Sequence, residues 1–566
     1  MRPSWRRAIG LSIAIGCLAA DTAYAVDKES APLLPSAKSR STKTDLARPA
    51  GVPEDAVLEA SGARIGEVHF KALELFDIGG RDQDSKLSRL ANRLHIRTRE
   101  ATIADQLLFR EGDLYSATTV AESARILRST RYLRDADIRP VAYHDGLVDL
   151  EVTTQDVWTL NPGFSFGRNG GKNTVSFDLE ELNLLGLGTQ AGIGYKSGID
   201  RDSTAIFYHD HQLGSSWWDL QTTYSDNSDG RLADFSLERP FYSLGARWAG
   251  GFALSDDLRV DSRYDLGEII DKYETHAKFA TAHYGFSNGL SNGWARRYSV
   301  GATYDDHQFT NAPDVDPALL LPGDRKLVYP WVAAEWVQDR FETTRNRDQI
   351  EKIEDYSLGW QFRAQVGFAG PATGSDRQAV MLDATASTGF DLSTRQSLIL
   401  TAAANGRLED GNVANGLLGA EARYYYRQSL RRVFFMGLAA TAGTNLDADT
   451  QVLLGGDNGL RGYPLRYQAG TGRWLFTAEQ RMFSNWYPFQ LFNVGGAVFY
   501  DMGRVVGRDP LGSEPQGLLK DVGVGLRFGN SRSALGNVLH VDFAFPLDGD
   551  PSISSMQIVV ETKRRF

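Results

Sequence analysis

Apolar and polar residues alternate along most of the chain, from about residue 158 to Phe566, in segments separated by Gly, Asn, Asp and Ser. Four segments show the alternation best: GGAVFYDMG (495–503), DVGVGLRF (521–528), HVDFAFP (540–546) and MQIVVETKRRF (556–566). In each, one side of the expected strand suits lipid and the other carries small or charged residues. A period of two residues predicts β-strands, and we count about twenty of them.

This pattern is typical of a transmembrane antiparallel β-barrel, because closure satisfies every backbone hydrogen bond while apolar side chains face lipid. A large soluble β-sandwich or β-helix is the alternative. A soluble sheet would hide its apolar face, and a β-helix would show a fixed short repeat, which we do not find. We therefore expect a mainly β protein in which residues 158–566 form an outer-membrane barrel.

A small α+β module is predicted ahead of the barrel, at residues 61–157. Strands are expected at 64–76, 135–143 and 146–155, the last two joined as a hairpin by a turn at Asp145-Gly146. Between the first two strands, the segment 115–133 has a helical pattern. Val120, Ala124 and Leu127 share one face of that helix, and Thr119 and Glu122 stand at capping-box spacing.

The N-terminus has the three-part layout of a secretory signal peptide: basic residues, a short apolar run and then Ala23-Tyr24-Ala25. We expect residues 1–25 to be removed. Residues 26–60, rich in Pro, Ser, Ala and Lys, show no periodic apolar face and are expected to be a flexible linker. Cys17 is the only cysteine, so the exported protein would contain no disulfide and no thiolate metal site.

Composition narrows the possible classes of protein further. The net charge is −10, whereas a nucleic-acid binder normally carries the opposite sign, so no nucleic-acid partner is expected. After the leader, no apolar run is long enough for a transmembrane helix. The 11% aromatic content and the 57 glycines fit an exported β-protein.

One loop of the expected barrel, GGDNGLRGYPLRY, carries Arg461, Gly462 and Tyr463 at its centre. By parity, Glu479 and Asp501 face the lumen on the next two strands. A loop folded into the barrel would let Arg461 form charge-assisted hydrogen bonds with these acids. Gly462 would let the backbone turn without steric cost, and Tyr463 would wedge against the wall.

Three motifs in chain order resemble those of the BamA/TamA superfamily of outer-membrane assembly and translocation barrels: EELNLLGLG (180–188), GLRGYP (459–464) and FYDMG (499–503, ending in Gly503). The module at 61–157 resembles one polypeptide-transport-associated (POTRA) domain. The resemblance implies that the loop arginine engages lumenal acids, which assigns Arg461 to Asp501 and, less directly, to Glu479. It also implies that Phe566 matches the C-terminal export signal at the barrel seam.

The sequence departs from the family pattern in four respects. Leu460 stands where Val or Ile is usual, and Arg564 stands where an apolar or aromatic residue is commoner. One periplasmic module is predicted where well-known members carry several. The family implies about sixteen strands, fewer than the pattern predicts, so either some segments are loop hairpins or this barrel is wider.

Three other features of the sequence bear on metal binding, catalysis and substrate contact. His209 and His211 share a strand face, which makes metal binding conceivable, but a polar barrel wall is the favoured interpretation and no metal is expected. The segment 167–174 lacks the first glycine of a phosphate loop, and no catalytic serine or zinc-protease motif occurs, so we expect neither a cofactor nor enzyme activity. The charge-dense segment 336–356 predicts a strand end and an exposed loop, with substrate contact as the alternative.

The resemblance implies a factor of the Gram-negative outer membrane that captures client polypeptides in the periplasm and inserts or translocates them at the barrel. Its expected partners are client outer-membrane or secreted polypeptides, membrane lipid, and periplasmic or inner-membrane accessory proteins. A two-partner secretion transporter, which is a pore for one exoprotein, is the main alternative, although residues 26–60 lack the stripe of a plug helix. A passive porin is disfavoured by the periplasmic module, and a lipid hydrolase by the absence of a catalytic motif.

Overall fold

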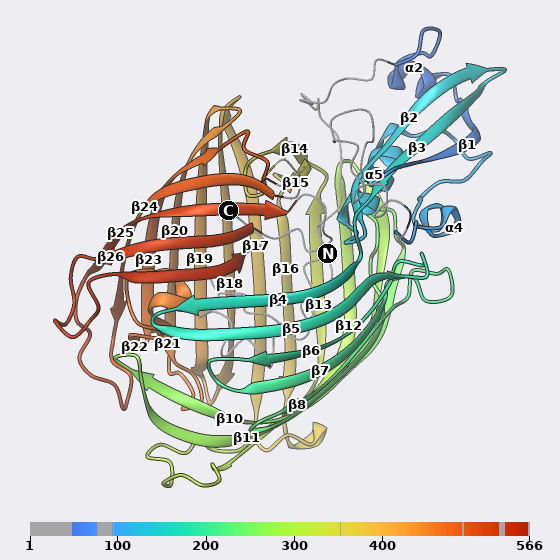
Figure 1. The fold of residues 1–566 in the computed structure, drawn as a ribbon. Helices are drawn as coiled ribbons and strands as arrows, with labels where there is room; N and C mark the ends of the chain where they lie inside the picture. The colour runs from blue at the N-terminus through green and yellow to red at the C-terminus, as the bar shows by residue number, and fades with distance from the viewer. Residues whose placement is uncertain are drawn as a thin grey trace.

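The computed structural model describes residues 48–75, 93, 95–350, 353–488, 492–530 and 538–563. These residues form a small three-stranded sheet with helices and a closed barrel (Figure 1). The expected signal peptide, most of the expected linker and Phe566 lie outside the described residues. Among the helices described, none has the length and apolar character that crossing a membrane requires.

The N-terminal module folds around its own apolar core. Its elements are α2 (Asp55–Ala60), β1 (Arg64–Leu73), α4 (Glu100–Ala104), α5 (Ala117–Ser129), β2 (Leu133–His144) and β3 (Leu147–Asp156). The central strand β3 pairs in parallel with β1 and antiparallel with β2. Val120, Ala124 and Leu127 of α5 are buried in the core, on the face that the helical pattern predicts.

Two local expectations for this module are wrong. The N-cap of α5 is Ser116, whose hydroxyl accepts a hydrogen bond from the Thr119 amide, so Thr119 is not the cap. The final residues of the expected linker form helix α2, and its Leu58 is fully buried in the core of the module. A helix of six residues shows too little periodicity for the sequence pattern to reveal it.

The barrel wall contains twenty strands, each antiparallel to its neighbours. In chain order they are β4 (Leu160–Asn169), β5 (Lys172–Leu184), β6 (Thr189–Ser197), β7 (Asp202–Asp210), β8 (Asp219–Asn227), β9 (Gly230–Arg239), β10 (Trp248–Asp265), β11 (Glu268–Ser291), β12 (Trp294–Asn311), β13 (Arg325–Gln338), β16 (Gln361–Ala369), β17 (Ala379–Ser393), β18 (Gln396–Glu409), β19 (Asn412–Ser429), β20 (Arg432–Thr444), β23 (Gly472–Phe483), β24 (Phe492–Val506), β25 (Leu519–Asn530), β26 (Val538–Pro546) and β27 (Gln557–Lys563). The count from the alternation pattern is confirmed, and the sixteen strands implied by family resemblance are wrong for this chain.

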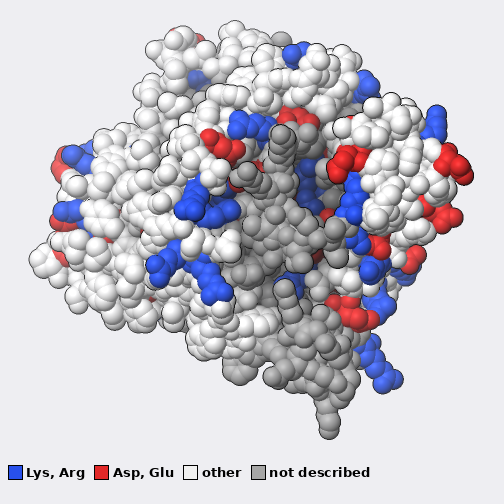
Figure 2. Space-filling model, turned by 90° about the horizontal axis from the view of Figure 1, so that it is seen from above, with Lys and Arg blue, Asp and Glu red and all other residues white. Residues whose placement is uncertain are grey.

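Alternation along each strand separates lipid-facing from lumenal residues. On β25, Val522, Val524 and Leu526 are exposed on the outer surface, whereas Asp521 and Arg527 are buried inside. Seen from above, broad white areas without charged side chains separate groups of Lys, Arg, Asp and Glu, which lie around the middle of the face and at its edges (Figure 2). Uncharged side chains on the outer surface are what the hydrocarbon of a bilayer requires.

Two hairpins project from the wall, one at each end. Because the strands are antiparallel, the connection between β13 and β16 lies at the end that carries the module, and the connection between β20 and β23 lies at the opposite end (Figure 1). The first contains β14 (Phe341–Arg345) and β15 (Ile353–Ser357); we call it the mouth hairpin. The second contains β21 (Val452–Leu454), a 3-10 turn η3 (Gly456–Asn458) and β22 (Gln468–Gly470); we call residues 445–471 the inner loop.

The mouth hairpin corrects the expectation of an exposed charged loop at 336–356. Arg347 and Asp348, at its tip, are only 5% and 3% exposed. Their charges are compensated by other side chains inside the barrel, which composition alone does not reveal.

The first and last strands close the barrel through a short contact, which we call the seam. Among the described residues, β27 and β4 pair at one register position, Val560 with Arg168. By contrast, β4 pairs with β5 over ten positions and β26 with β27 over seven. Among the described residues, the seam is therefore the junction of the wall with the fewest register pairs.

Candidate functional site: the inner loop and its contacts in the lumen

The inner loop carries Arg461 into the lumen, where it meets three strands. Nε and Nη2 of Arg461 donate to the two carboxylate oxygens of Asp501 on β24, at 2.7 and 3.1 Å. Nη1 donates to Glu479 on β23 at 3.0 Å and to Asp542 on β26 at 3.2 Å. The structure thus places Arg461 against both acids that parity assigned to the lumen, and adds a third.

The motif FYDMG on β24 contributes three inward-facing residues to this contact. Phe499 lies under the guanidinium, with Cζ of Arg461 3.3 Å from the ring centroid. Asp501 forms the two-point ion pair. Gly503 leaves room for the inner loop, because a Cβ there would lie 2.8 Å from the Trp474 carbonyl oxygen and 3.2 Å from the Leu454 side chain.

Gly462 lies in a turn, as predicted, in which the Tyr463 amide donates to the Leu460 carbonyl oxygen at 3.0 Å, and the structure adds a second role. Its backbone is not left-handed; instead it lies against β25, where an added Cβ would come within 2.7 Å of the Asp521 Cβ and 3.0 Å of the Pro546 nitrogen. Its amide donates to Asp521 at 3.1 Å. Close approach, and not a turn, requires glycine at this position.

Tyr463, at the tip of the inner loop, is fully buried. Its hydroxyl oxygen accepts a hydrogen bond from the Lys520 amide at 3.1 Å and lies 3.0 Å from the Asp548 carbonyl oxygen. The ring packs in an apolar cluster with Leu454, Leu460 and residues of β24 and β25. Apolar packing and hydrogen bonds together hold the tip of the loop.

The charges around Arg461 favour its protonated form. Burial alone would lower the pKa of Arg461, but the carboxylates of Asp501, Glu479 and Asp542 raise that pKa well above its ordinary value. Removing one member of such a buried network leaves the others unpaired, which costs about 3–5 kcal/mol.

The comparisons with known proteins identify the family. The model of the Omp85 superfamily domain matches residues 183–554, which is more than half of the chain. The chain belongs to the Omp85 superfamily. This Omp85 protein is therefore a β-barrel of the outer membrane.

Individual relatives are distant. A protein of Treponema pallidum (strain Nichols) named "Putative outer membrane protein assembly factor" is 25% identical over 216 residues, which cover 36% of this chain and 24% of the relative. The matched segment thus spans about a quarter of that protein. Among solved structures, BamA from Haemophilus ducreyi lacking POTRA domains 1-3 has 13% identity and a TM-score of 0.37, with 88% of this chain and 84% of that chain covered. CdiB from Acinetobacter baumannii has 13% identity and a TM-score of 0.41, with 89% and 73% covered.

In this Omp85 protein the network extends beyond the inner loop. Arg527 on β25 forms an ion pair with Asp542 and lies 3.5 Å from Glu479. Arg481 donates to Glu479 at 2.9 Å and, through Nη1, to Asp348 of the mouth hairpin at 3.0 Å. Glu479 and Arg481 therefore connect the inner loop, through ion pairs inside the lumen, with the tip of the mouth hairpin.

The mouth hairpin continues this chain to the N-terminal module. Arg128 of α5 donates to both carboxylate oxygens of Asp355, at 3.0 and 3.3 Å. A second contact joins the same helix to the turn between β9 and β10, where the Leu244 amide donates to Glu122 at 2.9 Å. The helix that packs on the module's sheet is thus held to two turns of the barrel.

The motif NLLGLG, at residues 183–188, forms a further docking turn between β5 and β6. The Gly186 carbonyl oxygen accepts from the Arg99 amide and from the Thr102 hydroxyl, both at 3.0 Å. Asn183 stabilises the turn by accepting from the Gly188 amide at 2.7 Å. The motif's place in the structure is a contact with the module, next to α4.

Sequence reasoning missed several residues of the network around Arg461 and Gly462. The alternation along β25 and β26 is clear in the sequence, so the inward direction of three side chains could be predicted: Asp521, Arg527 and Asp542. Their convergence on one loop could not be predicted, because register across strands is set by tertiary pairing. Asp348 carries no sequence signal, and Phe566 lies outside the described residues.

Proposed function

We propose that this Omp85 protein receives client polypeptides in the periplasm and assembles them into the outer membrane at its seam. The single observation that supports this most is the contrast between one register pair at the seam and ten and seven pairs at the junctions on either side. Opening the seam would break few hydrogen bonds. A client β-strand could then pair with the exposed edges of β4 or β27.

Arg461 and Gly462 of the inner loop support this role because their contacts brace the wall on one side of the seam, whereas Arg466 of the same loop reaches Asp200 on the other side. Arg461 contacts β23, β24 and β26, and Gly462 contacts β25, so one loop ties four consecutive strands. Among the described residues, no comparable contact joins Arg461 or Gly462 to β4 or β5. We infer that the C-terminal wall stays rigid while the seam separates.

The N-terminal module would supply the client. In its sheet order β1-β3-β2, the outer strands β1 and β2 offer edges to which an extended polypeptide can add. Its contacts with the barrel turns would deliver the client beside the mouth hairpin. Lipid at the seam and accessory proteins on the module are the further partners that this proposal includes.

A disulfide across the seam tests the proposal. Arg168 and Val560 are direct cross-strand partners, a spacing that a disulfide can bridge, so the double variant R168C/V560C can be locked by oxidation. Purified protein in liposomes is given an unfolded eight-stranded outer-membrane barrel, and protease-resistant folded product is measured. Oxidation should abolish the acceleration of folding, and a reductant should restore it.

The matched control places a disulfide between β4 and β5. Ser165 and Ser176 are register partners whose hydroxyl oxygens lie 2.7 Å apart, so S165C/S176C joins the seam strand β4 to its other neighbour, β5, and does not cross the seam. Its oxidation should leave client folding unchanged. Full activity of the locked seam variant would contradict insertion at the seam. If that variant also passes a secreted client across the membrane, the chain is a pore of the two-partner secretion kind.

A further inference from the structure

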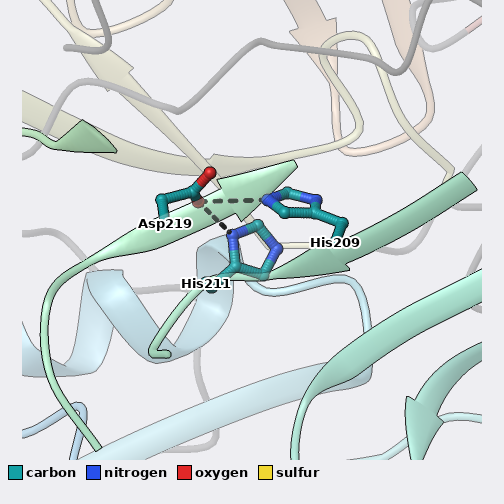
Figure 3. Close-up of side chains that lie close together, drawn as sticks. All are labelled: His209, His211 and Asp219. Atoms are coloured by element: carbon teal, nitrogen blue, oxygen red, sulfur yellow. Dashed lines mark hydrogen bonds and ion pairs between the residues drawn. The ribbon is translucent and has the colours of Figure 1, made fainter. Parts of the chain in front are cut away.

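A second cluster of side chains lies at the module's end of the barrel, away from Arg461. Nε2 of His209 and Nδ1 of His211 both point at one oxygen of Asp219, at 3.0 and 3.1 Å (Figure 3). All three donor atoms lie within 4.8 Å of one another. Two imidazoles and a carboxylate thus converge on one small volume.

The strand register explains the convergence. His209 lies on β7 opposite Gln221 on β8, and on its other side opposite Gln190 on β6. His211 lies two residues after His209, and Asp219 lies two residues before Gln221, so the alternation of the hairpin places both on the same face as His209 and Gln221. The chain presents four polar side chains from two adjacent strands toward one point.

Gln221 is a candidate fourth ligand. It is 3% exposed, its Nε2 lies 2.8 Å from Nε2 of His209, and its Oε1 has no hydrogen-bond partner among the described residues. The two ends of a glutamine amide have the same shape, and exchanging them brings the oxygen to the cluster. After that exchange the amide oxygen lies beside Nε2 of His209, where a cation could bind both atoms.

The outer contacts fit metal ligation as well. Gln190 lies 3.1 Å from Nε2 of His211, the ring nitrogen that does not face Asp219. Metal-bound histidines usually have their second nitrogen held by such a partner, which fixes the tautomer and the ring orientation. The side chain of His211 is 32% exposed, so a cation and a water molecule can reach the site from solvent.

We propose that His209, His211 and Asp219, with Gln221 as the fourth donor, bind a zinc ion. At Zn–N and Zn–O distances of about 2.0–2.2 Å, tetrahedral ligand atoms stand about 3.4 Å apart, so the two N···O distances need to widen by only a few tenths of an ångström. Imidazole with one carboxylate suits zinc and related transition metals, whereas magnesium and calcium prefer all-oxygen sites. The sequence favoured a polar wall because Asp219 and Gln221 come from the next strand.

The bound ion would stiffen a turn that contacts the module. Gln212, directly after His211, donates to the Asp105 carbonyl oxygen at 2.8 Å, at the C-terminal end of α4. The ion joins the ends of β7 and β8, which flank that turn. Zinc would therefore restrain the barrel turn that holds the module, independently of the seam and of the inner loop.

The test uses the full-length protein without a histidine tag, purified in detergent and freed of metal with a chelator. Zinc binding is measured by competition with a chromophoric chelator, and cobalt(II) is added in parallel for its tetrahedral absorption spectrum. We expect one ion per chain. H211A and D219N should each weaken binding by about 100-fold or more, and Q190A by about tenfold.

H276A is the matched control, because His276 contacts one carboxylate, Asp256 at 3.0 Å, in a pair and not in a cluster. It should bind zinc like the unmodified protein. A change in gel mobility between unheated and heated samples confirms that each variant forms a folded barrel. Hydrogen exchange of residues 211–218 should slow when zinc is added. Absence of binding at tens of micromolar zinc, or binding that H211A and D219N leave unchanged, would overturn the proposal.

Discussion

The guanidinium of Arg461 donates hydrogen bonds to both carboxylate oxygens of Asp501, although forty positions separate the two residues in sequence. This pair joins the tip of the inner loop to a strand of the barrel wall. Around it, Phe499 and Gly503 of the same strand accept the loop by stacking and by leaving space. Two short motifs of the chain are therefore the two halves of one contact.

Replacing Arg461 with alanine should destabilise the folded barrel by about 3–5 kcal/mol, because Asp501, Glu479 and Asp542 would lose a shared buried cation. Arg461→Lys keeps the charge but loses the two-point geometry, so an intermediate loss is expected. The free energy of unfolding of both variants is measured by urea titration, with the folded fraction read from the gel band that shifts on heating. The control is Arg508→Ala, whose partner Glu514 is exposed; equal losses in R508A and R461A would contradict a special role for the lumenal pair.

Gly462→Ala should displace the inner loop without removing any charge. The added methyl group would stand 2.7 Å from the Asp521 Cβ and 3.0 Å from a backbone nitrogen, which forces the loop away from β25 at a cost of about 1–3 kcal/mol. Protease cleavage within residues 445–471 reports the displacement. Gly323→Ala is the control, since a Cβ there meets nothing within 4 Å. Identical cleavage of the two variants would show that the close approach is not required.

Reversing one charge of the Arg128–Asp355 pair should loosen the module from the barrel. R128E places two carboxylates face to face, whereas the double variant R128E/D355R restores an ion pair in the opposite sense. Hydrogen exchange of α5 measures the docking. We expect faster exchange in R128E and recovery in the double variant; failure of the second substitution to restore protection would mean that other contacts hold the helix.

Docking of α5 against the turn between β9 and β10 should weaken as the pH rises. Burial raises the pKa of Glu122 to about 7, while the hydrogen bond from the Leu244 amide and the charges of Arg125 and Arg297 act in the opposite direction. Burial likewise raises the pKa of the neighbouring Asp339 to about 7. Because the docked pKa of Glu122 exceeds its ordinary value of 4.5, the stabilisation is complete below pH 4.5 and is lost as the pH rises through about 7.

Crosslinking between the module and the turn 240–247 at pH 6 and pH 8 measures this effect. The yield should fall at the higher pH in the unmodified protein. Glu122→Gln keeps an acceptor for the Leu244 amide and removes the titrating group, so its yield should change less. An unchanged pH dependence in that variant would assign the titration to another group, Asp339 being the nearest.

Periodicity was sufficient to predict the barrel and the number of its strands. Side chains alternate strictly along a strand, so the sequence of β25 predicts which residues are exposed, Val522 and Val524, and that Asp521 is buried. Family resemblance was less reliable than the pattern on this point, since strand number differs between barrels that share motifs. The short helix α2 was missed because Leu58 is buried by tertiary contact and not by periodicity.

The inner-loop contact was predicted in part. Arg461, Asp501 and Glu479 could be proposed together because parity places both acids on the lumenal face of neighbouring strands. The turn at Gly462 was predicted, but its close approach to Asp521 was not, because that depends on how far the loop enters the lumen. The buried mouth hairpin and its Asp348 were read as exposed, since a run of charges looks alike whether water or buried arginines compensate it.

By itself, the sequence determined the period-two strands, the apolar outer face and the separate N-terminal module, because each follows from local alternation and side-chain chemistry. Tertiary structure alone decided which residues meet: the acids around Arg461, the carboxylate shared by His209 and His211, and the pairing of Arg168 with Val560 at the seam. Those contacts depend on strand register and on loop entry into the lumen, and both are set by pairing between segments far apart in the chain.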